Sequence, residues 1–130
     1  MRGAGEMTES VRRKILIVDD QPTLARAIRR MLSDHDVTTV VSAREALDKI
    51  GAGERYDVIL CDVMMPVLSG MDLHKALATS APDQVAKMVF MTGGAFTKQA
   101  QEFFNHVPNP TIEKPFDRAA LFSLIDGLLR

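Results

Sequence analysis

Short apolar runs rich in β-branched residues alternate along the chain with segments whose apolar residues recur at helical spacing. The runs predict five β-strands, at about residues 15–18, 37–41, 56–61, 87–91 and 111–113. Each strand is followed by a predicted amphipathic helix, and these helices cover about residues 22–32, 42–51, 71–79, 100–107 and 117–128. Five strand–helix units in alternation predict an α/β fold: a doubly wound, five-stranded parallel sheet with right-handed crossovers and helices on both faces.

Residues near the ends of the predicted helices support these boundaries. Pro22 suits the first turn of the first helix. Ser42 and Glu45 have the spacing of a capping box, and Gly51 is expected to end the second helix. Asp117 is the expected N-cap of the last helix.

The two ends of the chain are read differently. Residues 1–13 are small, polar and aperiodic, which predicts a flexible lead-in and leaves 14–130 as a single domain. The last strand is short and follows Pro108 and Pro110, which predicts an edge position in the sheet.

Composition excludes several classes of protein. The 130 residues make one domain, and 16 Lys and Arg against 17 Asp and Glu leave a net charge of −1, so direct nucleic-acid binding is not expected. The single cysteine, Cys61, excludes an internal disulfide and is expected in the core. An apolar run of about 18 residues is missing, so membrane insertion is not expected and the protein is predicted to be cytoplasmic.

Polar residues with chemical potential follow four of the five predicted strands. Asp19 and Asp20 follow the first strand, Asp62 the third, Thr92 the fourth and Lys114 the fifth. In a parallel sheet the carboxyl ends of the strands meet at one edge, where such folds bind their ligands. The sequence therefore predicts three carboxylates, a hydroxyl and an ammonium group in one crevice.

This set of groups suits phosphoryl transfer to a carboxylate. Clustered carboxylates repel one another and favour a hard divalent cation such as Mg²⁺, one of them can attack phosphorus, and the hydroxyl and ammonium can bind the phosphoryl oxygens. Each residue alone also has a structural interpretation, because acids after strands cap helices or form turns and a lone lysine is usually a solvated charge. Their joint occurrence at four strand ends favours the functional interpretation.

Four segments give the chain a family resemblance. ILIVDD, VILCDVMMPVLSG, VFMTGG and IEKPF occur in this order and with family-like gaps, and the match extends from Lys14 to Arg130. The chain resembles the receiver domain of bacterial response regulators and hybrid histidine kinases. The resemblance implies a flavodoxin-like sheet with strand order 2-1-3-4-5.

The resemblance also implies a metal site. Asp20 is expected to ligate Mg²⁺ directly and Asp19 mostly through water, while Asp62 and the backbone carbonyl of Met64 complete the protein ligands. Mn²⁺ is the alternative metal.

The other implied roles concern the phosphoryl group. Asp62 is the expected phosphoacceptor, Thr92 the switch hydroxyl and Lys114 the partner of the phosphoryl oxygens. The bond from Lys114 to Pro115 is expected to be cis, and Pro66 with Gly70 is expected to shape the loop after the third strand.

The chain departs from the family pattern at a few positions. Many receivers carry an aromatic residue three positions before the lysine, where this chain has Thr111, so the aromatic half of the usual switch is missing. Met64 and Gly94 stand at positions that influence water access to the acyl phosphate in the family. Their expected effects are opposed, because Met64 can shield the phosphoryl group and Gly94 leaves space.

The function implied by the resemblance is phosphorylation-controlled signalling. The domain takes a phosphoryl group from a histidine kinase or a histidine phosphotransfer protein, and its change of conformation controls the binding of a downstream protein. It is not expected to be a turnover enzyme, although it catalyses its own phosphorylation and autodephosphorylation. Arg26, Arg29 and Arg30 form a solvated helix face that can also dock a partner, and a homodimer through segments 100–107, 111–113 and 117–128 is a further possibility.

Two other hypotheses remain at this stage. Thr111 leaves open a degenerate receiver that binds partners independently of phosphorylation. A phosphatase of the haloacid-dehalogenase kind would also use Mg²⁺ and an aspartyl nucleophile, but that class needs an acid two residues after the nucleophile, where this chain has Met64.

Overall fold

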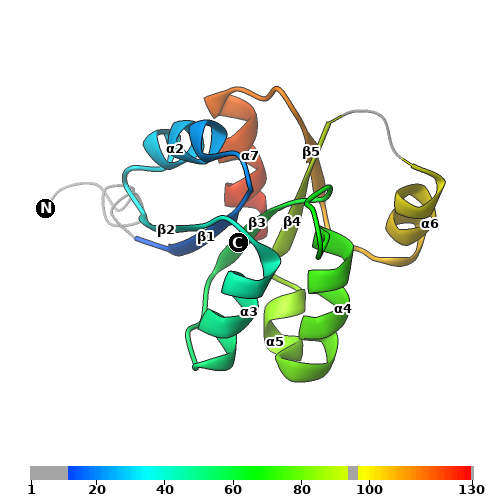
Figure 1. Cartoon of the computed structure of the whole chain (residues 1–130). Helices are drawn as coiled ribbons and strands as arrows, with labels where there is room; N and C mark the ends of the chain where they lie inside the picture. Colours follow the sequence, from blue (N-terminus) through cyan, green and yellow to red (C-terminus); the bar gives the residue numbers. More distant parts are fainter. Residues whose placement is uncertain (1–11, 94–96, 130) are drawn as a thin grey trace, which may run out of the picture.

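Five parallel strands form one sheet in the order β2-β1-β3-β4-β5 in the computed structural model, which describes residues 12–93 and 97–129 (Figure 1). The strands are β1 (Lys14–Val18), β2 (Asp36–Val40), β3 (Val58–Asp62), β4 (Met88–Thr92) and β5 (Thr111–Glu113). The fold class, the five strands and their order are therefore confirmed. Most of the expected lead-in, as well as Gly94, lies outside the described residues.

Helices cover both faces of the sheet. Within the described residues they are α2 (Pro22–Met31), α3 (Ala43–Gly51), α4 (Gly70–Ser80), α5 (Pro82–Val85), α6 (Lys98–His106) and α7 (Arg118–Leu128). In Figure 1, α2 and α7 lie above the sheet and α3, α4 and α5 below it. Among the described residues, the helices are too short or too polar to cross a membrane.

The sheet separates two hydrophobic cores. Successive residues of the central strands alternate between them. In β1, Leu16 and Val18 pack in the core with α3 and α4, while Ile15 and Ile17 pack in the core with α2 and α7. All five residues of β3 and of β4 are buried. This burial on both faces explains why the sequence of each strand is a nearly continuous apolar run. Cys61 is buried in the first core as expected, and burial raises the pKa of its thiol.

Side chains cap the starts of α3 and α7 largely as predicted. The Asp117 carboxylate accepts a hydrogen bond from the backbone N–H of Ala120 at 2.8 Å. The Ser42 hydroxyl accepts one from the N–H of Glu45, whose own carboxylate binds the N–H of Val41 rather than that of Ser42. A complete capping box occurs instead at the start of α4, between Ser69 and Asp72.

The end of α3 corrects the role expected of Gly51. Gly51 is the last residue of the helix, Ala52 is the C-cap, and the left-handed conformation belongs to Gly53, whose φ is +105°. The helix therefore ends at Gly51 as expected, but its C-cap is one residue later and the left-handed glycine two residues later.

The short helix α5 is an element that the apolar pattern does not predict. Its residue Gln84 is 2% exposed, and its side chain accepts a hydrogen bond from the Tyr56 N–H at 2.9 Å and donates one to the Tyr56 carbonyl at 3.2 Å. The amide thus satisfies both backbone groups of Tyr56 just before β3 begins, which fixes the entry of the strand that ends in Asp62.

Both edges of the sheet are only partly covered. β5 has a single buried residue, Ile112, between exposed Thr111 and Glu113. The predicted edge position of this strand is therefore confirmed, and Thr111 lies on an exposed position of it.

Candidate functional site

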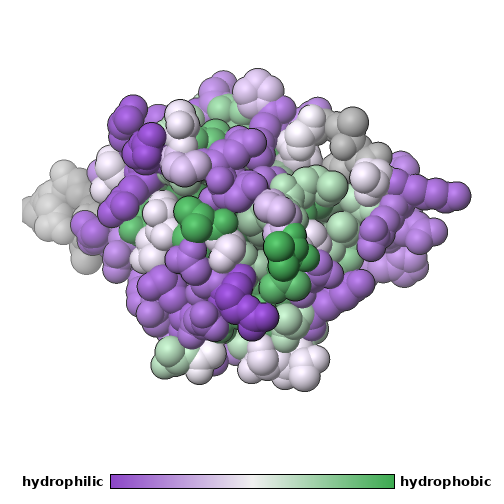
Figure 2. Space-filling model, viewed as in Figure 1, coloured by the Kyte–Doolittle hydropathy of each residue, from purple (hydrophilic) through white to green (hydrophobic). Residues whose placement is uncertain are grey.

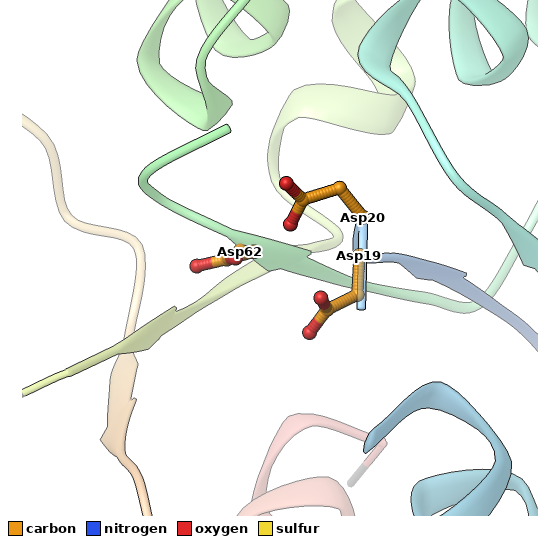
Figure 3. A group of neighbouring side chains, drawn as sticks. All are labelled: Asp19, Asp20 and Asp62. Atoms are coloured by element: carbon orange, nitrogen blue, oxygen red, sulfur yellow. The ribbon is translucent and has the colours of Figure 1, made fainter. Parts of the chain in front are cut away.

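Three carboxylates converge at the carboxyl ends of β1 and β3. Asp19 and Asp20 follow β1, Asp62 is the last residue of β3, and each offers an oxygen within 4.8 Å of the other two. Figure 3 shows Asp19 and Asp20 leaving the chain in different directions beside Asp62. The convergence expected from the strand ends is therefore present for all three acids.

Lys114 brings the opposing charge. Its Nζ lies 3.6 Å from Asp19 Oδ2 and 3.4 Å from Asp62 Oδ1, and its side chain is 18% exposed. Its backbone N–H donates to the Thr92 carbonyl at 2.7 Å, just past β5, and the bond from Lys114 to Pro115 is cis as expected. The lysine is thus a partly buried member of the cluster and not a solvated surface charge.

Asp19 is more deeply buried than a helix cap would be. It is 0% exposed, its Oδ1 accepts a hydrogen bond from the Gln21 N–H at 2.8 Å, and within the described residues its Oδ2 has no hydrogen-bond partner. The N-cap of α2 is Gln21, which makes no side-chain capping bond, so neither Asp19 nor Asp20 caps this helix. The Gln21 N–H was not among the expected site groups, although a hydrogen bond from two residues ahead is a common aspartate arrangement.

Asp62 is held in a partly desolvated position. It is 6% exposed, and its Oδ1 accepts a long hydrogen bond of 3.4 Å from the Met64 N–H. Burial raises the pKa of the Asp62 carboxyl, Lys114 opposes this rise, and the negative charge of Asp19 adds to it. Because burial makes the negative charge of this carboxylate unfavourable, binding of a cation or bonding of an oxygen to phosphorus would stabilise the group.

Gly70 fixes the backbone behind Asp62. A Cβ added at Gly70 would lie 2.6 Å from the Asp62 carbonyl oxygen and 3.2 Å from Cys61 Sγ. The Gly70 N–H donates to the Val63 carbonyl at 2.9 Å, so the start of α4 packs directly on the end of β3. Only glycine fits this approach, which supports the expected role of Gly70 in shaping the loop.

Fewer contacts define the positions of the remaining expected site residues, Thr92 and Met64. Thr92 is 4% exposed at the end of β4, one position beyond Met91, which pairs with Asp62 in the sheet. Met64 is 58% exposed and contributes its backbone N–H to Asp62. The roles of the Thr92 hydroxyl and the Met64 carbonyl stay predictions.

The carboxylate cluster fits a hard divalent cation. Carboxylate oxygens are the preferred ligands of Mg²⁺. The buried Asp19 Oδ2 accepts no hydrogen bond among the described residues and lies 3.6 Å from the Lys114 ammonium, so it is an acceptor that a bound cation would satisfy. Lys114 supplies one positive charge against three carboxylates, so the site keeps an excess of negative charge for a metal to balance.

A strained turn lies at the rim of this site. Val67 has a φ of +70°, and the Leu68 N–H donates to the Pro66 carbonyl at 2.9 Å, which makes the rare, strained form of the γ-turn. A β-branched residue is unfavourable at positive φ, and Val67 is 98% exposed, so its side chain gains little from packing.

We expect Val67→Asn to raise the free energy of unfolding by about 1 kcal/mol, because asparagine tolerates the left-handed conformation. Chemical denaturation measures the change. Val41→Asn serves as the control, since Val41 is also exposed, at 52%, and has ordinary backbone angles. An equal gain in both variants would contradict backbone strain as the cause.

We expect Asp62→Asn to stabilise the metal-free protein near neutral pH. The pKa of Asp62 is raised in the folded state above its usual 3.8, so its contribution to stability is lost as pH rises from 3.8 through the folded pKa. The advantage of the variant should therefore be full above the folded pKa and disappear as pH approaches 3.8. Thermal melts of both proteins in EDTA across this pH range measure the difference, and a constant difference would count against it.

Comparison with known proteins identifies the family. The family model described as "Response regulator receiver domain" matches residues 15–126, and the chain belongs to this family. Receiver domains are signalling domains of two-component systems, which agrees with the carboxylate cluster, the lysine and the sheet order described above.

Two curated relatives illustrate the sequence similarity. The chain is 30% identical to the response regulator MprA of Mycolicibacterium vanbaalenii over 119 residues, which cover 90% of this chain and 50% of that protein. It is 33% identical to the transcriptional regulatory protein BtsR of Escherichia coli K12 over 111 residues, 83% of this chain and 44% of that protein. The chain thus spans about half the length of these relatives.

Solved structures extend the similarity to the fold. The receiver domain of sensor histidine kinase PA1611 from Pseudomonas aeruginosa, with magnesium in its active-site cleft, aligns with a TM-score of 0.77 and 27% identity over 92% of this chain and 98% of that one. The chemotaxis protein CheY4 of Vibrio cholerae aligns with a TM-score of 0.78 and 26% identity over 91% and 99% of the two chains.

Proposed function

We propose that this receiver domain accepts a phosphoryl group on Asp62 from the phosphohistidine of a histidine kinase or a histidine phosphotransfer protein. The observation that carries the proposal is the cluster itself: the Asp62 carboxylate lies with those of Asp19 and Asp20 within 4.8 Å and with the Lys114 ammonium at 3.4 Å. The metal-bearing receiver of the Pseudomonas kinase supports the same arrangement here.

The acids would hold the metal. Asp20 is the proposed direct ligand, Asp19 acts mostly through water, and Asp62 and the Met64 carbonyl complete the protein ligands. When bound, Mg²⁺ (or Mn²⁺) neutralises negative charge on the phosphoryl oxygens. The buried, hydrogen-bonded position of Asp19 keeps its carboxylate oriented toward the other two acids.

The chain's own residues carry the transfer. An oxygen of the Asp62 carboxylate attacks phosphorus, so a P–O bond forms while the P–N bond to the partner's histidine breaks and the imidazole leaves. The Lys114 ammonium, 3.4 Å from Asp62 Oδ1, is placed to pair with the phosphoryl oxygens as charge builds on them. Charge that is costly on a desolvated Asp62 is thereby spread over a larger, better-paired group.

The signal would follow from the same contacts. The Thr92 hydroxyl, at the end of β4, is the proposed group that moves toward the phosphoryl oxygens, and Lys114 is tied to Thr92 by the backbone hydrogen bond of 2.7 Å. A shift of both residues would bias a two-state equilibrium that a downstream protein reads. With Thr111 at the aromatic position, this coupling runs through β4 and the start of the loop after β5.

The test is phosphorylation by a small acyl-phosphate donor with Mg²⁺, followed by mass spectrometry of the intact protein. We expect wild type and Asp126→Asn, an exposed acid on α7, to gain one phosphoryl group, and Asp62→Asn to gain none. Equal labelling of Asp62→Asn would overturn the assignment. Partner affinity that ignores phosphorylation would favour the interaction module, and fast hydrolysis of phosphate esters would favour the phosphatase.

A further inference from the structure

An open hollow of about 520 Å³ lies far from the carboxylate cluster. Its walls come from the C-terminal half of α2, the turn that follows it, the start of β2 and the segment before β1. Lys14 pairs with Asp36 at the beginning of both strands, so the hollow lies at the amino ends of the strands, whereas Asp19, Asp20 and Asp62 lie at the carboxyl ends. It is therefore a separate feature from the phosphoacceptor site.

Four arginines line this hollow: Arg12, Arg26, Arg29 and Arg30. We therefore call it the arginine hollow. All four are exposed, and across residues 12–93 and 97–129 their side chains form neither ion pairs nor hydrogen bonds with other groups. Arg26, Arg29 and Arg30 are three and four residues apart, so α2 presents them on one side. Figure 2 shows hydrophilic side chains gathered over α2 in the upper left of the view.

The wall that carries Arg12 is fixed to the opposite wall. The Arg13 N–H donates to His35 Nδ1 at 3.1 Å, and the Asp36 N–H donates to the Arg13 carbonyl at 2.9 Å. These two bonds hold Arg12 across from the arginines of α2, so the hollow is pre-formed.

Helix stability explains only part of this concentration of charge. Arg29 and Arg30 lie in the last turn of α2, where cations interact favourably with the helix dipole. Arg26 is a turn earlier and Arg12 is on another segment, and like charges at helical spacing repel one another. Among the described residues of the lining, Asp36 is the one acid, so four guanidinium groups there face one carboxylate in a chain whose net charge is −1.

We propose that the arginine hollow binds a small phosphate ester of about nucleotide size that carries two or more phosphate groups. Guanidinium groups bind phosphate oxygens through paired hydrogen bonds, and four of them can neutralise several negative charges. The volume lies within the range of small-molecule sites. Val37 adds an apolar surface for a base or ring, and Ser33 and Asp36 offer a hydroxyl and a carboxylate for its polar groups.

The shape of the charge distribution favours a small ligand over a macromolecule. The arginines surround one concave site, and the whole chain has nearly balanced charge, unlike a protein that tracks along a nucleic-acid backbone. Duplex DNA, an acidic peptide and an anionic membrane are therefore the alternative ligands that the test compares with a small phosphate ester.

The experiment is isothermal titration of the full chain with ATP and, separately, with pyrophosphate, in EDTA so that the metal site is empty. We expect one-to-one binding of both probes that weakens as salt rises. The double variant Arg26→Gln/Arg30→Gln should bind about a hundredfold more weakly, since each lost charged hydrogen bond costs about tenfold. Arg44→Gln, an exposed arginine on α3, and Asp62→Asn should bind like wild type.

Further outcomes decide against the proposal. Binding undetectable at millimolar ATP and pyrophosphate overturns it, as does equal weakening by Arg44→Gln. Tight binding of duplex DNA, a poly-glutamate peptide or phosphatidylserine vesicles without ATP binding would also overturn it. Thermal melts show whether each variant is folded, and ATP-induced NMR shifts of the Ser33 and His35 amides in the wild type locate the site without any substitution. Because Asp62→Asn tests phosphorylation, the two proposals fail independently.

Discussion

We expect Gly70→Ala to lower the free energy of unfolding by about 1–3 kcal/mol, the usual cost of overpacking a tight core. The added methyl group would lie 2.6 Å from the Asp62 carbonyl oxygen, a backbone atom at the end of a fully buried strand. Neither wall can give way easily, because the Gly70 N–H also binds the Val63 carbonyl at 2.9 Å. The displaced backbone carries Asp62, so phosphorylation by an acyl-phosphate donor should slow as well.

Two other helical glycines give matched controls. At Gly51 and Gly127 an added Cβ would have no atom within 4 Å apart from neighbouring backbone of the same helix, and neither glycine has a positive φ. Alanine at either position should raise stability by about 0.5–1 kcal/mol, because glycine weakens helices. Urea denaturation of the three variants measures the expected loss of stability in Gly70→Ala and the expected gains in the two controls. Gly70→Ala with stability equal to or above wild type would show that the contact between α4 and β3 relaxes freely.

The second large effect is expected from Lys114→Met in metal-free buffer. Among the described residues, Lys114 is the cationic side chain that lies within 4.0 Å of both Asp19 and Asp62. Its removal leaves the negative charges of these two buried carboxylates less well balanced. Breaking a fully buried pair costs about 3–5 kcal/mol. Because the lysine is 18% exposed, we expect a smaller loss of about 2–3 kcal/mol. The pKa of Asp62 should rise further, since Lys114 is the main influence that lowers it.

Urea denaturation with and without Mg²⁺ gives a signature that simple loss of packing would not produce. Mg²⁺ at a hundred times its Kd should stabilise the wild type by about 2.7 kcal/mol and restore part of the loss in Lys114→Met. Lys114→Arg keeps the charge and should lose less, and Lys75→Met, on the exposed side of α4, should change stability by less than about 0.5 kcal/mol. A Lys114→Met loss that Mg²⁺ leaves untouched would contradict the electrostatic explanation.

The sequence was a good guide to the strands and to the residues at their ends. Buried parallel strands produce continuous apolar runs, and the residue that ends each run is set by where burial stops, so Asp62 and Thr92 could be placed at a common edge without a template. Asp117 was identifiable as a cap because a capping carboxylate acts within three residues of its own position.

Features that depend on tertiary contacts were not predictable in this way. The four residues of α5 are too few to show helical periodicity, and what holds this segment is the distant pairing of Gln84 with Tyr56. The positive φ of Val67 could not be expected from its residue type, because valine normally avoids positive φ. Gly53, two residues after the expected glycine, takes the left-handed position because α3 continues through Gly51.

Within the site, residue identity was predictable and environment was not. Asp19 and Asp20 are adjacent and chemically identical, yet the first is fully buried and accepts a hydrogen bond from Gln21, while the second is half-buried. That difference depends on which face of the chain turns toward Lys114, and Lys114 is about ninety residues away in sequence. The four arginines of the arginine hollow likewise come from two segments whose proximity depends on the sheet register.

The brevity of β5 has a consequence for self-association. An open sheet edge offers unpaired backbone groups to the edge strand of another molecule, and this is how many folded proteins begin to aggregate. Here the outer strand has three residues, a proline lies on either side of it at Pro110 and Pro115, and Glu113 adds an exposed charge. A strand this short cannot template a long intermolecular ladder, so the β5 edge of the sheet should contribute little to self-association.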